Sequence, residues 1–437
     1  MSVEVPQMDE LLRIVPTAAY GDDAPGPDRR GGALHLSAIL PAVSNALGCP
    51  VPTAVHRDPA ALQAALGLPD ARSAIVVLVD GLGYWNLAMR LGHAPYLRSL
   101  MREGANQRPV STCAPSTTVA AMGVFGTGSC PGLTGMAGYT QLDPASGRLV
   151  QLIQFKQVTP PAPAVPGLHG ATARAQAARA SKAAEPALDP RDLQREPTVF
   201  ERLARQGMRV TASGLAKFRD SPLTQAALRG PDYIANVTPN DRVRAAADAA
   251  RTPGLTYLYI RDIDKVGHAS GWQSAPWVGA FERVDGQLAL LRRLAPKGTL
   301  IVVTADHGMV TADPTQRVDI AADPTLTRGV AHVGGEPRAL MLYAEEGEDP
   351  AAIASRWRER LGERALVRTK DQALADRLFG PVEARVAPML GDVIVQAAGQ
   401  VTLVDPRIQS DKATRLPAVH GSQTMLEMDV PCLIDVA

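Results

Sequence analysis

The sequence contains few cysteines and few aromatic residues. Its four cysteines, Cys49, Cys113, Cys130 and Cys432, are scattered without C-x-x-C spacing, which argues against a cysteine zinc site. Scattered free thiols are typical of a reducing compartment, so we expect a cytoplasmic protein. Aromatic residues make up only 4% of the chain, and we therefore expect a core built from Ala, Val and Leu.

Neither sign of charge predominates, and long apolar runs are absent. Lys and Arg number 45 against 44 Asp and Glu, which gives a net charge of +1. A protein that binds nucleic acid duplexes usually has a basic excess, so we expect no such binding. No apolar run approaches the roughly 18 residues that a membrane span needs. The first residues, MSVEVPQMDELLRIVP, lack the basic and apolar regions of a signal peptide, and we expect no membrane association.

The chain is long and its composition changes along its length. A length of 437 residues is enough for one large α/β core with insertions, or for two domains. We expect an N-terminal arm with short helices over residues 1–70 and a main domain over residues 71–437. A Pro- and Ala-biased segment at about residues 158–197 is interpreted as an insertion or lid.

Three continuous apolar runs predict strands that are buried on both faces, as in parallel sheets. They are AIVVLV (74–79), TYLYI (256–260) and TLIVVTA (299–305). Between the last two lies PWVGAFERVDGQLALLRRLA (276–295), whose apolar residues have helical spacing. Strand, helix and strand at this distance form a βαβ unit. We therefore predict an α/β fold, a three-layer sandwich around a mainly parallel sheet.

Each of these runs is followed by acidic residues. Asp80 follows the first run, Asp264 and His268 follow the second, and Asp306 and His307 follow the third. Ligands of open parallel sheets bind outside the carboxyl ends of the strands. Three carboxylates that converge there without a cation would repel one another and resist ionisation. The pattern therefore indicates a metal site, whereas a single Asp after a strand would indicate a turn or cap.

Carboxylate and imidazole ligands suit Zn²⁺, with Mn²⁺ or Fe as alternatives. Two metal sites need a third histidine. His420 in LPAVHGSQT is the best candidate, and His332 in VAHVGGEP is the rival. The remaining histidines are interpreted as surface or packing residues: His35, His56, His93 and His169.

A nucleophile is expected within STCAPSTTVAAMGVFGTGSCPGLTGMAGY (111–139), which is rich in hydroxyls and glycines. A hydroxyl at a helix N-terminus that touches a metal can ionise and attack phosphorus. Composition alone does not choose among Ser116, Thr117 and Thr118, and each could instead cap a helix. The segment has neither the P-loop spacing nor the G-x-G-x-x-G spacing. Its glycines therefore predict neither a P-loop nor a Rossmann dinucleotide-binding loop.

Taken in order along the chain, these motifs resemble those of the alkaline phosphatase superfamily, in its nucleotide pyrophosphatase/phosphodiesterase-like branch. The motifs are VDGLG, PSTTVAAMGVFGTG, DKVGH, TADHGM and a C-terminal HG. The resemblance runs from about Ile75 to the C-terminus, apart from the 158–197 insertion. It implies an enzyme, a hydrolase of phosphodiesters or pyrophosphates that uses two divalent metal ions.

The resemblance also implies roles for single residues. The family's nucleophilic threonine stands three residues after a proline and ten before the glycine of a Thr-Gly pair, which corresponds here to Thr118. One metal would be held by Asp264, His268 and His420. The other would be held by Asp80, Asp306, His307 and the Thr118 oxygen. Three aspartates and a threonine alkoxide balance two divalent cations in charge.

The implied mechanism is in-line attack of Thr118 on a small-molecule phosphate ester, which gives a phosphothreonine that water then hydrolyses. The chain departs from the family at Tyr139, where animal members have an asparagine that binds a phosphate oxygen. A phenol can still donate a hydrogen bond to substrate from that position. This departure leaves the preference for nucleotide diesters open.

Several alternatives remain beside this hypothesis. A phosphomonoesterase of the same superfamily is the nearest. A sulfatase is disfavoured because Cys113 is in the wrong register and Thr117 replaces an arginine; a phosphoglycerate mutase is disfavoured because it uses serine. A non-catalytic binding protein would have lost metal ligands, and all seven expected groups are present. The sequence does not predict an oligomeric state.

Overall fold

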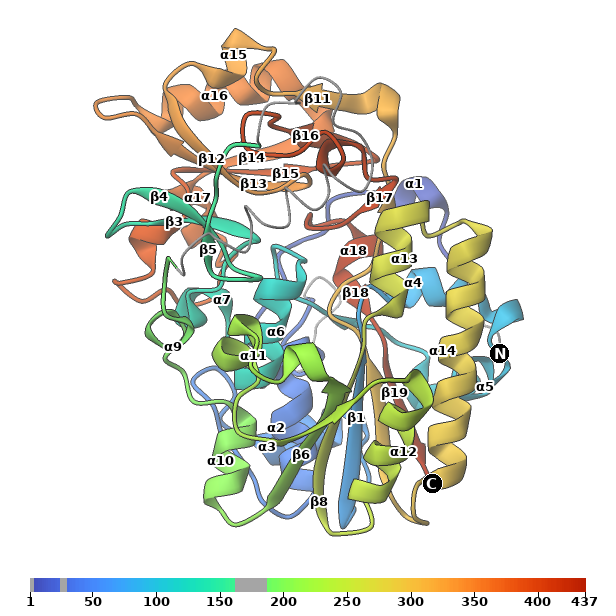
Figure 1. Cartoon of the computed structure of the whole chain (residues 1–437). Helices are drawn as coiled ribbons and strands as arrows, with labels where there is room; N and C mark the ends of the chain where they lie inside the picture. The colour runs from blue at the N-terminus through green and yellow to red at the C-terminus, as the bar shows by residue number, and fades with distance from the viewer. Residues whose placement is uncertain (1–3, 24–29, 162–186) are drawn as a thin grey trace.

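The computed structural model describes residues 4–23, 30–161 and 187–437. Its centre is a six-stranded sheet in the order β19-β9-β1-β8-β6-β7, parallel except for β19, which runs antiparallel to β9 (Figure 1). The strands are β1 (Ser73–Val79), β6 (Arg209–Leu215), β7 (Asp232–Asn236), β8 (Gly254–Ile260), β9 (Leu300–Thr304) and β19 (Cys432–Val436). Every residue of β1 and β9 is buried, which explains why their sequences are continuously apolar.

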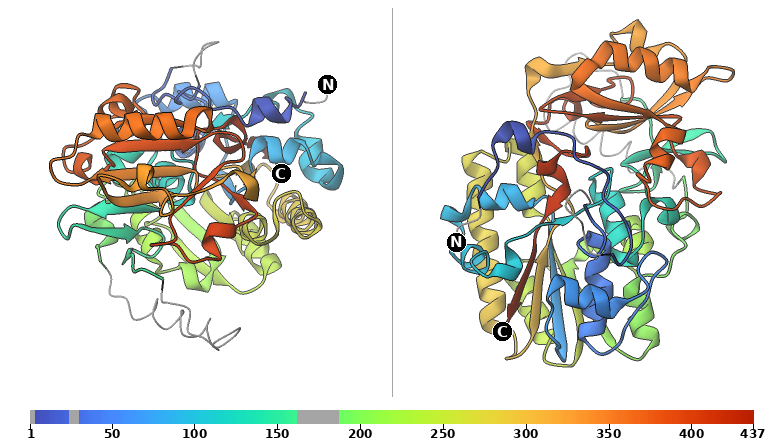
Figure 2. Two further views of the ribbon diagram at one scale, coloured as in Figure 1. Left: turned by 90° about the horizontal axis from the view of Figure 1, so that it is seen from above. Right: turned by 180° about the vertical axis from the view of Figure 1, so that it is seen from behind.

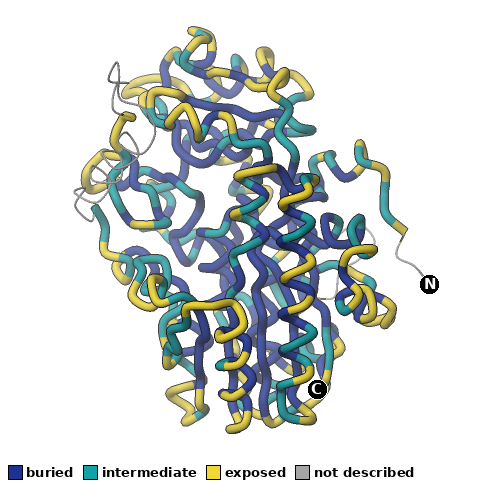
Figure 3. Tube along the Cα trace, turned by 45° about the vertical axis from the view of Figure 1, so that its right-hand side comes forward, coloured by how far each residue is buried: buried dark blue, intermediate teal, exposed yellow. Residues whose placement is uncertain are grey.

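Helices cover both faces of this sheet and make three layers (Figures 1 and 2). One face carries α5 (Pro95–Leu100), α12 (Pro239–Ala249) and α14 (Ala275–Leu294). The other carries α2 (Leu36–Ala46), α3 (Pro59–Leu66), α6 (Thr118–Thr127) and α10 (Val199–Arg205). Burial follows these layers, because the inner strands of the sheet are largely buried while the helices expose their outer sides (Figure 3). The edge strand β7 is partly exposed.

A second sheet lies beyond the carboxyl ends of the central strands (Figure 1). It is antiparallel, in the order β12-β13-β15-β14, and α16 (Pro350–Leu361) packs on it. Its strands are β12 (Val330–Glu336), β13 (Ala339–Ala344), β14 (Ala365–Thr369) and β15 (Val393–Ala397). Apolar residues on one face of this sheet form a hydrophobic cluster separate from that of the central sheet, and the cluster includes the fully buried Trp357.

The remaining helices and strands are short. The helices are α1 (Met8–Leu11), α4 (Tyr84–Ala88), α7 (Pro131–Thr134), α9 (Pro190–Leu193), α11 (Pro222–Ala227), α13 (Asp262–Ser270), α15 (Pro324–Thr327), α17 (Lys370–Ala375) and α18 (Met425–Met428). The strands are β2 (Val110–Ser111), β3 (Thr140–Asp143), β4 (Arg148–Gln151), β5 (Lys156–Gln157), β10 (Val310–Thr311), β11 (Arg317–Asp319), β16 (Thr402–Val404), β17 (Ala418–Val419) and β18 (Asp429–Val430).

The α/β fold with a mainly parallel sheet is confirmed, and the three predicted strands are β1, β8 and β9. The predicted helix between β8 and β9 is α14, and β1 lies between those two strands. The central part of the predicted insertion, residues 162–186, lies outside the described residues. The domain boundaries at residue 70 and around the insertion stay predictions. Within the part of the chain that the structure describes, no helix is long and apolar enough to cross a membrane.

Candidate metal centre

Three neighbouring strands deliver the predicted carboxylates to one edge of the central sheet. Asp80 follows β1, Asp306 follows β9, and α13, which carries Asp264, follows β8. The backbone N–H of Asp264 donates to the carbonyl of Asp80 at 3.0 Å, and the N–H of Gly81 donates to Oδ1 of Asp306 at 3.0 Å. The three strand ends are therefore joined by hydrogen bonds.

The turn after β1 depends on Gly81. Its φ is +74°, in the left-handed region, and a Cβ there would lie 2.9 Å from the Cβ of Asp264. Only glycine allows this close approach without strain. Gly81, which follows the aspartate of VDGLG, thus allows the two predicted ligands Asp80 and Asp264 to lie close together.

The first predicted metal group is assembled from α13 and the C-terminal loop. Asp264 and His268 lie four residues apart on α13 and so share one face of the helix. Nε2 of His268 lies 3.1 Å from Oδ1 of Asp264, and Nε2 of His420 lies 3.8 Å from the same oxygen. The two Nε2 atoms are 3.2 Å apart. All three side chains therefore converge on one point.

The second predicted group contains Asp80, Asp306, His307 and Thr118. Nε2 of His307 lies 3.6 Å from Oδ1 of Asp80 and 3.5 Å from Oδ2 of Asp306. The hydroxyl of Thr118, the first residue of α6, lies 3.1 Å from the same nitrogen. Asp80, Asp306 and His307 form one group with metal-binding spacing; Asp264, His307 and His420 form another. His307 thus belongs to both of these groups, and His268 belongs to neither.

Backbone carbonyls hold His268, His307 and His420 in the tautomer that leaves Nε2 free to bind a metal. Nδ1 of His268 lies 2.8 Å from the carbonyl of Ala418, and Nδ1 of His420 lies 2.9 Å from that of Ser116. Nδ1 of His307 lies 3.0 Å from the carbonyl of Gly308. A carbonyl can only accept, so each Nδ1 carries the proton and each neutral Nε2 presents a lone pair.

The carboxylates also fit a cation. Asp80 Oδ1, Asp264 Oδ1 and Asp306 Oδ2 are buried and have no hydrogen-bond partner among the described residues. Burial, followed by the charges of Asp306 and Asp264, raises the pKa of Asp80 well above its usual value. Buried, unpartnered carboxylate oxygens beside free imidazole nitrogens are a donor set for divalent cations.

The other sequence candidates lie elsewhere. His332 lies on β12 and belongs to neither group. His35 and His56 are fully buried and hydrogen bond to Ser37, as packing residues do, and His169 lies outside the described residues. His93 is exposed and faces Glu282.

Tyr139 is not joined to either metal group by a hydrogen bond among the described residues. Its hydroxyl accepts from Gln151, and its backbone N–H donates to Oε2 of Glu336 at 2.9 Å. Burial raises the pKa of Tyr139, and the hydrogen bond from Gln151 opposes this shift. A role for Tyr139 in substrate binding stays a prediction.

Two residues near the centre were missed by the sequence analysis. The hydroxyl of Tyr259, on β8, donates to Oδ2 of Asp80. Glu336 is buried at the end of β12, beside Thr117, and burial raises its pKa to about 8. The only signal for Tyr259 is that it alternates with Tyr257 in the apolar run. Glu336 has no such signal.

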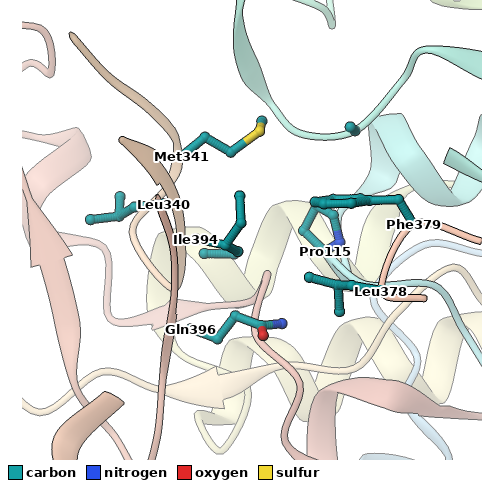
Figure 4. A pocket seen from close by; sticks show the side chains of 9 residues that line it. Pro115, Leu340, Met341, Leu378, Phe379, Ile394 and Gln396 are labelled. Atoms are coloured by element: carbon teal, nitrogen blue, oxygen red, sulfur yellow. The ribbon is translucent and has the colours of Figure 1, made fainter. Parts of the chain in front are cut away.

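A small cavity between Pro115 and the second sheet is a separate feature (Figure 4). Side chains of Met341, Leu378, Phe379 and Ile394 line it, and Gln396 is its one polar side chain. An apolar lining of this kind offers little to a phosphate group. The groups at the strand ends, and not this cavity, are therefore the candidate catalytic site.

Comparisons with known proteins agree with this architecture. The family model for type I phosphodiesterase / nucleotide pyrophosphatase matches residues 74–423. An inactive variant of murine ectonucleotide pyrophosphatase / phosphodiesterase 5, in complex with AMP, superposes with a TM-score of 0.60 at 16% identity, over 83% of this chain and 87% of that one. Phosphonoacetate hydrolase from Sinorhizobium meliloti, in complex with phosphonoformate, gives 0.57 at 21% identity, over 84% and 90%. At sequence identities of 16% and 21%, the similarity to these two structures establishes only the fold.

Curated relatives match a shorter segment. Phosphopentomutase of Rhizobium johnstonii is 34% identical over 127 residues, which is 29% of this chain and 29% of that protein. The enzyme of Sinorhizobium medicae is 34% identical over 122 residues, or 28% of each chain. The matched segment thus spans less than a third of the length of these relatives.

Proposed function

The chain belongs to the type I phosphodiesterase / nucleotide pyrophosphatase family, a family of phosphoester hydrolases, and on this basis we propose that it hydrolyses a small-molecule phosphodiester or pyrophosphate through a phosphothreonine on Thr118. The observation that carries the proposal is the position of the Thr118 hydroxyl. It starts α6 and lies 3.1 Å from Nε2 of His307, within one of the two groups that could hold a metal.

Asp264, His268 and His420 would hold one divalent cation, and Asp80, Asp306, His307 and Thr118 the other. Zn²⁺ suits these ligands best, and Mn²⁺ is the alternative. When bound, the two cations supply positive charge that lowers the pKa of the Thr118 hydroxyl and stabilises the attacking and leaving oxygens.

The chain's own groups then perform the displacement. Thr118 Oγ1 attacks phosphorus, the bond from phosphorus to the leaving oxygen breaks, and the alcohol or phosphate departs from the opposite side. Water subsequently cleaves the bond between phosphorus and Thr118 Oγ1, which regenerates the hydroxyl. The backbone N–H groups at the start of α6 would stabilise the negative charge that develops on the phosphoryl oxygens.

One known protein supports the role of Thr118, and another supports a second candidate substrate. The inactive murine variant carries an alanine in place of a threonine, and it was solved with AMP, a phosphate ester. The match to proteins named phosphopentomutase supports a phosphomonoester substrate as the second candidate.

A panel of 4-nitrophenyl esters tests the proposal. We expect the metal-loaded enzyme to release nitrophenol faster from bis(4-nitrophenyl) phosphate than from 4-nitrophenyl phosphate. Thr118→Ala should reduce turnover at least about 1000-fold, because the nucleophile is removed. Thr118→Ser keeps a hydroxyl and should retain measurable turnover. Full activity in the alanine variant would refute the proposal, and a preference for the monoester would favour the second candidate.

A further inference from the structure

Ser116 is a residue of the segment 111–139 to which the proposed function gives no role. It lies two residues before Thr118 and is fully buried. It is not the N-cap residue of α6, because Thr117 takes that position. Its hydroxyl instead donates to the backbone carbonyl of Ser422, at 2.7 Å. A fully buried hydroxyl that donates to a carbonyl is poorly placed to attack a substrate, so another role has to account for Ser116.

Four hydrogen bonds join Ser116 to the His420 loop (residues 420–423). The backbone N–H of Ser116 donates to the carbonyl of Gly421 at 3.0 Å, and the N–H of Gly421 donates to Ser116 Oγ at 3.2 Å. The hydroxyl donates to Ser422, as above, and Nδ1 of His420 donates to the carbonyl of Ser116 at 2.9 Å. The N–H, the carbonyl and the hydroxyl of Ser116 are therefore all used to hold three consecutive residues of this loop.

The second sheet closes the other side of the His420 loop. Gly421 has a φ of +131°, and a Cβ there would lie 2.6 Å from Cγ of Glu336, which is buried at the end of β12. Oγ of Ser422 donates to the carbonyl of Ala397, on β15, at 2.6 Å. The loop is thus packed between Ser116 and the second sheet. Without the Ser116 hydroxyl, two buried backbone groups of the loop lose the partner that the structure gives them, and the loop can regain partners only by moving.

We propose that Ser116 is a positioning residue that fixes His420 against the start of α6, so that this ligand and Thr118 are aligned before any metal binds. The two lie close together, because the Thr118 hydroxyl is 3.1 Å from Nε2 of His307 and the rings of His307 and His420 stack with centroids 3.5 Å apart. Ligands that are held in place by neighbours bind a metal more tightly. This inference rests on the proposed function and adds a residue to it.

Hydrogen exchange of the chelator-treated wild-type protein tests this alignment without any variant. The peptide that covers residues 420–423 should be protected in the absence of metal, because Ser116 Oγ accepts from the N–H of Gly421. In Ser116→Ala the same peptide should exchange about tenfold faster. Rapid exchange of this peptide in the wild type, slowed only after Zn²⁺ is added, would overturn the inference.

Metal affinity and turnover test the consequence for the site. In calorimetry with Zn²⁺, Ser116→Ala should bind the ion at the His420 group about tenfold more weakly. Its kcat on bis(4-nitrophenyl) phosphate should fall about tenfold with little change in KM, because Ser116 aligns groups and does not touch the substrate. Ser129→Ala is the matched control and should behave as the wild type. Ser129 is also fully buried, and its hydroxyl has no hydrogen-bond partner among the described residues.

The possible outcomes separate positioning from a merely structural role. Lower thermal stability of Ser116→Ala with wild-type metal affinity and kcat would overturn the inference. If Ser116→Ala does not fold, hydrogen exchange of the wild type decides. Failure of the wild-type enzyme to hydrolyse any nitrophenyl ester would sink the proposed function. Hydrogen exchange and metal affinity need no substrate, so they would still decide the role of Ser116.

Discussion

At the scale of single residues, the proposed ligands depend on neighbours that hold them in place. Tyr259 donates its hydroxyl proton to Oδ2 of Asp80, which leaves Oδ1 free. A neighbour that orients a ligand typically affects metal affinity or activity about 10–100-fold. Sequence analysis could not assign this role, because an alternating tyrosine in a strand gives no indication of which carboxylate it contacts.

We predict that Tyr259→Phe lowers metal affinity about 10–100-fold, because Asp80 loses its hydrogen bond. The measurement is a metal titration of chelator-treated protein. Tyr257→Phe is the matched control, since Tyr257 lies on the same strand and its hydroxyl contacts the sulfur of Met122, at 3.8 Å. Equal affinities in the two variants would contradict the role of Tyr259.

Glu336 should make stability depend on pH. Burial raises its pKa from an ordinary 4.5 to about 8 in the folded chain. Folding therefore favours the protonated, neutral form of Glu336. The stability that this group contributes is present below pH 4.5 and is lost as the pH rises towards 8.

We expect Glu336→Gln to flatten the decline in the free energy of unfolding over that pH range, measured by urea denaturation with a chelator present. Glu363→Gln, at an exposed position, should leave the pH profile as in the wild type. An identical slope in both variants would show that Glu336 does not titrate as described.

At the scale of secondary structure elements, β1, β8 and β9 could be predicted because strands buried on both faces need uninterrupted apolar residues. Helix α13 was not predicted. Its sequence, DIDKVGHAS, is mostly polar, and the residues that stabilise it come from elsewhere in the chain, such as the carbonyl of Asp80 that accepts from Asp264. The i, i+4 spacing of Asp264 and His268 acquires its meaning only once the helix is known.

The turn after β1 should tolerate no side chain. We predict that Gly81→Ala destabilises the protein by about 1–2 kcal/mol, because φ is positive there, and weakens metal binding, because the new Cβ displaces Asp264. By contrast, Gly286→Ala, inside α14, should stabilise the protein by about 0.5–1 kcal/mol. Apart from the chain neighbours and the helix's own backbone, no described atom lies within 4 Å of its added Cβ. Thermal denaturation and metal titration measure both. Wild-type metal affinity in Gly81→Ala would contradict the role of the turn.

At the scale of the whole molecule, a buried ion pair connects the second sheet to the loop that carries His420, a proposed metal ligand. Arg338 follows β12, and its guanidinium donates to both carboxylate oxygens of Glu427, at 2.8 and 2.9 Å. Glu427 also accepts from the backbone N–H of Ser422, at 3.0 Å, two residues after His420. The second sheet was not predicted from sequence, because such contacts join residues that are far apart in the chain.

We predict that Arg338→Met destabilises the protein by about 3–5 kcal/mol, because Glu427 is left buried without its cation. The double variant Arg338→Met with Glu427→Gln should lose less than the two single variants together. Arg415→Met removes an exposed pair with Asp411 and should change stability by less than about 1 kcal/mol. Additive losses in the double variant would contradict the coupling.

We propose that the ends of β1, β8 and β9 and the C-terminal loop together hold two divalent cations beside Thr118. Metal content is measured by mass spectrometry after loading with Zn²⁺ or Mn²⁺ and dialysis. We expect about two ions per chain in the wild type and about one in His268→Ala, which removes a ligand from one group only. One ion or none in the active wild-type enzyme would refute a centre with two cations.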